Sequence, residues 1–262
     1  IDRVDGFKKA ISVLDDAITA VNANAISSSF TANIPAGIDI VNTLYALKAR
    51  YSLFAGLYTQ ALTAAGQVDI SKKSTFNFDA LSLNPIFETA TSTNNVVQVK
   101  DSTLGLLAPL QPALNDGRIA FYTSINPTIA PRFRINGFGA AATTAFPVYL
   151  PGEITLIKAE CYARAASPDL VNGLAQLNIV VTKNNDPFNV NANQPAIASV
   201  STQAELLDQI YRHRCIELYM SGLKLEDMRR FGRPNAERKR NLMPYPLRER
   251  DNNPNTPADP VF

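Results

Sequence analysis

The sequence predicts a helical fold that is interrupted by one long irregular insertion. Helical pairs are expected over about residues 1–70 and 150–232, the insertion over about 71–149, and an extended tail over 235–262, all within a single domain. At both ends apolar residues recur at spacings of three and four, which is the pattern of a helix with one buried face. Within the insertion this periodicity is weak, and Ser, Thr, Asn and Pro are frequent. So long an irregular stretch is usually functional or disordered, and its apolar residues favour order.

The first helix is predicted from one apolar face near the start of the chain. Its members are Val4, Phe7, Ile11, Leu14, Ile18 and Val21. A Ser- and Asn-rich linker, "NANAISSSFTANIPAG", follows.

A second helical block covers about residues 40–68, with a small residue on a first helix, glycine at the turn, Tyr two residues on, and alanines on a second helix. These are Ala46, Gly56, Tyr58, Ala61 and Ala65. Their order resembles one tetratricopeptide repeat, although a generic helical hairpin has the same local structure.

Helices return after the insertion. The stretch "LPGEITLIKAECYARA" predicts a helix that begins at Pro151 or Gly152. A second helix is expected after "ASPD", with Ser167 as the N-cap and Pro168 in the first turn.

The last long helix is expected to open at Ser201, with Thr202 beside it and Glu205 in the first turn. Gly222 is expected to interrupt or end it. One or two further turns, "LEDMRRFG", are expected to close at Gly232.

Composition excludes several classes of protein. Of the 262 residues, 46% are hydrophobic and 18% charged, which is typical of a globular chain. A net charge of +2 is too small for a general nucleic-acid or membrane-surface binder. No apolar run reaches the roughly 18 residues that span a bilayer. The two cysteines, Cys161 and Cys215, lie on apolar helical patterns and are expected to be free and buried.

No pattern of catalytic, metal-binding or cofactor-binding residues is evident. The lone histidine, His213, has no nucleophile elbow nearby and too few partners for a metal site. It is expected to lie beside Glu217, four residues on. The charged residues around it (Glu217, Glu226, Asp227, Arg229 and Arg230) are expected to form structural ion pairs. The basic run 229–250 has few stacking aromatics and matches no nucleic-acid module.

The best candidate for ligand binding is the stretch "GRIAFYTSINPTIAPRFRINGFGAA" in the insertion. Aromatic rings bind the C–H faces of sugars while polar groups bind their hydroxyls. The candidate residues are Tyr122, Arg132, Phe133, Arg134, Asn136 and Phe138, with Arg118 nearby. Packing of the same aromatics in a core is the alternative, and the absence of Trp weighs against a carbohydrate ligand. Upstream, "NNVVQVK" is expected to be a short strand.

The stretch "RCIELYMSGLKLEDMRRFG" resembles the SusD/RagB family. The matching residues are Arg214, Ile216, Glu217, Leu218, Gly222, Asp227, Arg229, Arg230 and Gly232. The departures are His213 and Ser221 where the family has Glu, Cys215 and Lys224 where it has Arg, and Phe231 where it has Trp.

Three further stretches resemble the family in the same order. They are "LYALKARYSLFAGLYTQALTAAGQV", "LIKAECYARA" and "LMPYPLRERDNNPN". The resemblance covers essentially the whole chain, whereas family members are usually nearly twice as long. We therefore expect an N-terminal portion, with its lipid anchor, to be missing here.

The resemblance implies an all-α scaffold of tetratricopeptide-like helical hairpins that carries the irregular insertion. It implies a surface-exposed lipoprotein of the outer membrane that binds a glycan and delivers it to a SusC-like TonB-dependent transporter, without catalysis. The alternatives are a RagB-like peptide-binding protein and a helical-repeat adaptor that binds only its partner protein. A glycan hydrolase is the weakest alternative, because it needs two carboxylates facing one cleft.

Overall fold

The structure is a computed structural model that describes residues 2–91, 98–125, 128, 133–238 and 245–258. Its internal contacts divide the chain into two compact units, Ile1–Tyr219 and Met220–Phe262. The placement of a single domain over 1–262 stays a prediction.

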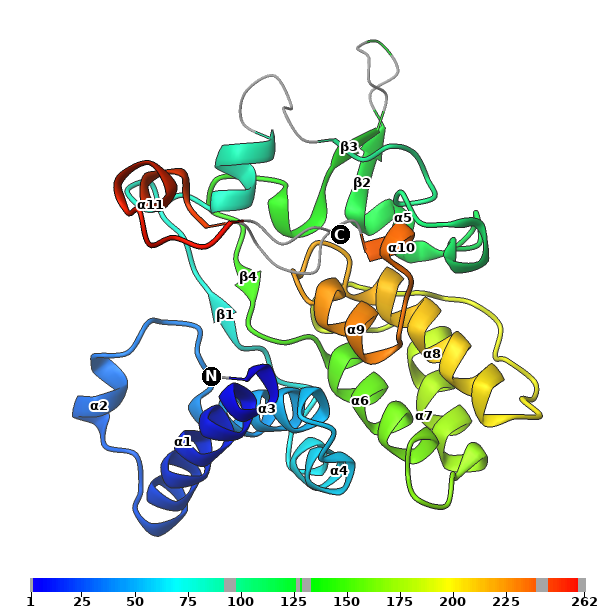
Figure 1. Cartoon of the computed structure of the whole chain (residues 1–262), viewed down its shortest axis with the longest axis horizontal. Coiled ribbons are helices and arrows are strands. Elements are labelled where there is room, and N and C mark those ends of the chain that lie inside the picture. The colour runs from blue at the N-terminus through cyan, green and yellow to red at the C-terminus, as the bar shows by residue number, and fades with distance from the viewer. Residues whose placement is uncertain (1, 92–97, 126–127, 129–132, 239–244, 259–262) are drawn as a thin grey trace. The chain divides into compact units, whose positions relative to one another are not determined.

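The first unit begins with a group of three helices (Figure 1). Helix α1 (Arg3–Ala23) packs against α3 (Ile40–Phe54), and α3 pairs with α4 (Tyr58–Gly66), while the short α2 (Ser28–Ala32) lies in the linker. The turn between α3 and α4 has Gly56 at φ +76°, where a side chain would be strained. The alanines of α3 and α4 are at most 3% exposed, which lets the two helices approach closely. The predicted helices and turn are therefore confirmed.

A second group comprises α6 (Pro151–Ala163), α7 (Leu170–Thr182) and α8 (Gln203–Glu217). Helix α6 is buried on almost every side, because α3, α4, α7 and α8 all contact it. Two of the predicted helix starts are wrong by one or two residues. Asp169, not Ser167, caps α7, since its carboxylate accepts a hydrogen bond from the Asn172 backbone.

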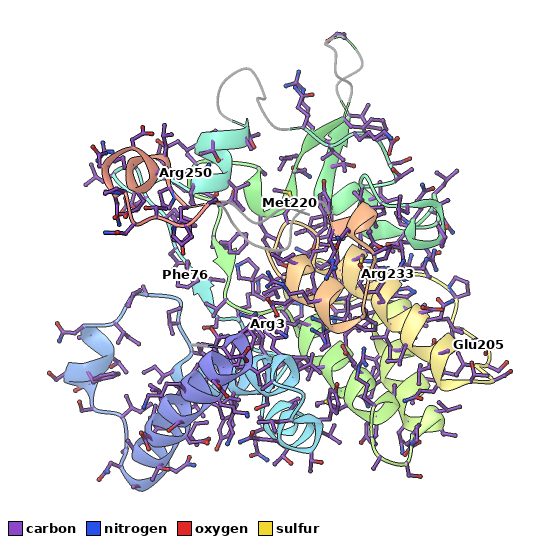
Figure 2. All side chains as sticks on the ribbon, in the orientation of Figure 1. Arg3, Phe76, Glu205, Met220, Arg233 and Arg250 are labelled. Carbon is purple, nitrogen blue, oxygen red and sulfur yellow. The ribbon has the colours of Figure 1, made fainter. Side chains whose placement is uncertain are left out.

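Thr202, not Ser201, caps α8. Its hydroxyl accepts a hydrogen bond from the backbone of Glu205, and the Glu205 carboxylate accepts one from the Thr202 backbone in return. Figure 2 labels Glu205 at this helix start. The reciprocal pair satisfies two backbone donors that the first turn leaves without helical partners.

The insertion contains two small antiparallel sheets and several short helices. Strand β1 (Thr75–Phe76) pairs with β4 (Phe146–Pro147), and β2 (Thr123–Ile125) pairs with β3 (Phe133–Ile135). The helical pieces are the π-helix η1 (Phe87–Thr91), the 3₁₀ helices η2 (Ala108–Leu110) and η3 (Gly137–Gly139), and α5 (Gly117–Tyr122). Of the strand predicted in "NNVVQVK", residues 94–97 lie outside the described residues, and 98–100 form no strand.

The second unit contains α9 (Lys224–Arg230), α10 (Asn235–Arg238) and α11 (Leu247–Asn252). Gly232, with φ +60°, follows the end of α9, as the sequence predicts. Gly222, with φ +80°, lies between α8 and α9, but α8 already ends at Glu217, before the predicted position. The prediction of an extended tail is wrong where α10 and α11 form. Each follows a proline, Pro234 or Pro246, whose restricted φ favours a helix start. No described helix combines the length and the apolarity that crossing a membrane requires.

Candidate functional site

The β2–β3 hairpin displays three of the predicted ligand-binding residues. Its register pairs Thr123 with Ile135, Ser124 with Arg134, and Ile125 with Phe133. Side chains alternate between the two faces of a strand, so Arg134 and Ser124 share one face and Ile135 and Thr123 share the other. The second face is the core side, because Ile135 and Thr123 are 7% and 6% exposed.

The hairpin therefore separates polar and aromatic candidates. Asn136 continues the extended backbone two residues after Arg134, so both lie on the outer face with the exposed Ser124. Phe133 lies on the opposite face, across from Ile125, which is 55% exposed. Arg134, Asn136 and Phe133 are all half-buried and remain accessible to a ligand.

The other two described candidates, Tyr122 and Phe138, are buried, at 1% and 8% exposure. Phe121 contacts both rings edge-on, with ring centres 4.9 Å from Tyr122 and 5.1 Å from Phe138. Tyr219, Phe146 and Phe188 extend this aromatic cluster. In this structure Tyr122 and Phe138 therefore pack in an aromatic core, as the core-packing alternative states. Arg132 lies outside the described residues.

Two buried contacts hold the loop that follows β3. The fully buried Asn84 side chain donates hydrogen bonds to the carbonyls of Phe138 and Thr144 at 2.8 and 2.7 Å. Gly137 has φ +60°, and a Cβ at this position would lie 2.7 Å from the Phe121 ring. These contacts fix the backbone at the base of the hairpin, next to Asn136.

A buried cluster of charges is centred on Arg118 and adjoins the aromatic cluster at Tyr122. The Arg118 guanidinium is 0% exposed and donates to both oxygens of Asp116 and to Glu217 Oε2, the latter at 3.2 Å. Its Nη2 also donates to Nδ1 of His213 at 3.1 Å. As predicted, His213 lies one helical turn from Glu217 on α8, and both side chains contact the same Arg118 guanidinium. Arg118 itself is part of the interior and not of a ligand surface.

Glu217 joins this cluster to the rest of the first unit. Its other carboxylate oxygen, Oε1, accepts a hydrogen bond from Lys183, which also donates to Asp186 at 2.7 Å. Its backbone carbonyl accepts a hydrogen bond from the Tyr122 hydroxyl at 2.6 Å. Helix α8, α5 and the loop that follows α7 are thereby tied together. The prediction that Glu217 forms a structural ion pair is confirmed.

The electrostatics of the cluster explain two pKa shifts. Burial, together with the positive charges of Arg118 and Arg212, holds the pKa of His213 well below its ordinary value. Burial would also lower the pKa of Arg118, but the hydrogen bond with Asp116 and the charge of Glu217 outweigh it and raise that pKa. His213 is therefore neutral at neutral pH. This agrees with the hydrogen bond from Arg118, because only a neutral imidazole has a ring nitrogen that can accept one.

The remaining predicted contacts are structural. In the second unit, Arg230 pairs with Asp227 at 2.8 Å and Arg229 pairs with Glu226, as predicted. Cys161 and Cys215 are buried thiols outside any disulfide, also as predicted. Across the described ranges, no group of three or more His, Cys, Asp or Glu side chains is placed to hold a metal ion.

Sequence analysis missed Asn84, Phe121, Lys183 and Asp186. The Asn-Pro pair at residues 84–85 is a turn signal that points to a local role for Asn84. Lys183 and Asp186 lie in a polar loop, where no periodicity indicates burial.

No protein-family model and no curated protein matches the chain. Solved structures share its fold. A SusD-like carbohydrate binding protein from Bacteroides vulgatus ATCC 8482 has 17% identity and a TM-score of 0.63, over 86% of this chain and 51% of that one. A SusD-like carbohydrate binding protein from Bacteroides fragilis NCTC 9343 has 14% identity and a TM-score of 0.58, over 88% and 59%. A SusD-like protein from the same organism has 13% identity and a TM-score of 0.59, over 86% and 60%.

The fold defined by these helical pairs and their insertion is the SusD-like fold, as the sequence predicts. The chain spans about half to three fifths of the length of these structures.

Proposed function

We propose that this protein binds glycans at the surface of the outer membrane and delivers oligosaccharides to a SusC-like TonB-dependent transporter, without catalysing a reaction. The observation that carries the proposal is the fold shared with two solved structures that are named as carbohydrate binding proteins. Membrane attachment through a lipid anchor outside this chain is part of the proposal.

Within the proposal, the β2–β3 hairpin contacts the glycan. Arg134 and Asn136 hydrogen-bond sugar hydroxyls from the outer face. Phe133 lies across from the exposed Ile125, where the second face is open to solvent, and packs on a sugar ring that extends around the edge of the strand. No described atom accepts from or donates to the Asn136 side-chain amide, so it is available to a ligand. Tyr122 and Phe138 contribute indirectly, as buried residues that pack in the aromatic cluster, and Arg132 completes the proposed set of binding residues.

The test is calorimetry of the protein against a panel of neutral and acidic polysaccharides and oligosaccharides. We expect at least one glycan to bind, and Phe133→Ala and Asn136→Ala to weaken its binding at least tenfold with an unchanged circular dichroism spectrum. Phe30→Ala is the matched control, because Phe30 is 55% exposed on α2, outside the insertion. If no glycan binds and peptides bind instead, the RagB-like alternative replaces the proposal.

A further inference from the structure

Arg134 differs from other arginines of the first unit because its Nε has no acceptor among the described residues. Arg50 donates to Glu153 at 2.6 Å, Arg164 to Glu160 at 2.7 Å, and Arg212 to a backbone carbonyl at 2.8 Å. Arg134 is half-buried, yet its Nε is shielded from solvent and has no hydrogen-bond partner. No carboxylate among the described residues lies within ion-pair distance of it. Among the described residues, the shielded Nε donor of Arg134 is thus unpaired.

The local sequence contains no counter-charge. From Ile119 to Gly152 there is no Asp or Glu, while Arg132 and Arg134 are both present. The nearest acid on the N-terminal side, Asp116, already accepts two hydrogen bonds from the buried Arg118. An anion at Arg134 must therefore come from another residue that approaches in space or from a bound ligand.

The backbone around Arg134 is held in place. Its strand pairs with β2, the Asn136 amide donates to the Tyr122 carbonyl at 2.9 Å, and π-helix η1 contacts both β3 and η3. Single π-helical turns are frequent at functional sites. The exposed Ser124 hydroxyl and the Asn136 amide lie on the same face as the guanidinium. This face therefore presents the Arg134 guanidinium together with two neutral groups, Ser124 and Asn136, that can hydrogen-bond hydroxyls.

We propose that this face takes an acidic glycan, with Arg134 binding the carboxylate of a uronic acid residue while Asn136 and Ser124 bind its hydroxyls. A guanidinium binds a carboxylate through two parallel N–H donors. If the Arg134 side chain changes rotamer, the carboxylate can bind the edge of the guanidinium that carries Nε. The carboxylate then provides the acceptor that Nε lacks. The inference rests on the proposed glycan-binding function and narrows its ligand class.

The test compares trigalacturonate with its methyl ester, which has the same backbone without the negative charges. By calorimetry we expect the acid to bind at least tenfold more tightly at low salt, and this preference to shrink as salt rises. Arg134→Gln is expected to abolish the preference, and Arg134→Lys to keep part of it, because lysine retains the charge without the fork. Arg248→Gln, which removes an exposed arginine of α11, is the control for net charge and keeps the preference.

Equal binding of acid and ester, or a preference that survives Arg134→Gln, overturns the inference. If neutral glycans bind and depend on Asn136 in that case, the proposed function stands while the inference fails. If no glycan of either kind binds, both fail.

Discussion

Replacing Glu217 with alanine is expected to lower the free energy of unfolding of the first unit by about 3–5 kcal/mol, the range for breaking a buried ion pair by removing one partner. Glu217 is 0% exposed and accepts hydrogen bonds from Arg118 and Lys183, which are 0% and 12% exposed. Each charge-assisted hydrogen bond contributes about 1.5–3 kcal/mol, so the loss of both gives a similar figure. At roughly 2–4 °C per kcal/mol, the midpoint of thermal unfolding falls by about 6–20 °C.

The assay is urea unfolding followed by circular dichroism, with thermal unfolding as a second measure. Asp208→Ala is the matched control, because Asp208 is an exposed acid on the same helix, α8. It is expected to change the free energy of unfolding by less than about 0.5 kcal/mol. A decrease in the free energy of unfolding below about 1 kcal/mol for Glu217→Ala would refute the reasoning. Arg118 and Lys183 would then tolerate burial without the Glu217 carboxylate. A double-mutant cycle of Glu217→Gln with Lys183→Met isolates the pair, and we expect a coupling of about 1–3 kcal/mol.

Three further predictions concern other parts of the first unit. His213 has a depressed pKa in the folded state, so the unfolded chain binds more protons below about pH 6.5 and stability falls as pH drops from there. The loss approaches about 1.4 kcal/mol per pH unit, and urea midpoints from pH 7 to 5 should show it for the wild type and not for His213→Gln. Gly137→Ala, which places a methyl group against Phe121 at positive φ, is expected to destabilise by about 1–3 kcal/mol and to change the near-ultraviolet spectrum of the aromatic cluster. Thr202→Ala removes the α8 cap and is expected to cost about 1 kcal/mol in urea unfolding, and an unchanged midpoint would contradict the capping role.

Local sequence patterns were sufficient to predict the helical scaffold. Spacings of three and four identify α1, and the glycines at 56, 222 and 232 identify turns and helix ends, because both signals depend on neighbours within a few residues. The cap positions were off by one or two residues, at Asp169 and Thr202. Several adjacent polar side chains can cap a helix, and the final backbone conformation selects one of them.

The candidate site was predictable as a stretch of sequence and not as a surface. The sequence places aromatic and basic residues together between 118 and 138, but only strand pairing shows that Arg134 and Asn136 share a face and that Phe133 lies on the other. Burial then separates the buried Tyr122 from the accessible residues. The same residue types serve as core and as ligand platform, so composition cannot distinguish the two roles.

The periodicity of the chain determined its helices, its turns and the position of the insertion. Tertiary structure alone decided that Arg118, which the sequence grouped with the ligand-binding candidates, pairs with Glu217 in the interior. It also decided that the Nε of Arg134 has no partner among the residues that the structure describes. The physical reason is separation along the chain: Arg118 and Glu217 are 99 residues apart, and a contact over that distance depends on how every intervening element packs. The local periodicity of the sequence does not indicate such a partner. Helix faces and caps can be predicted because they depend on residues at most four positions away.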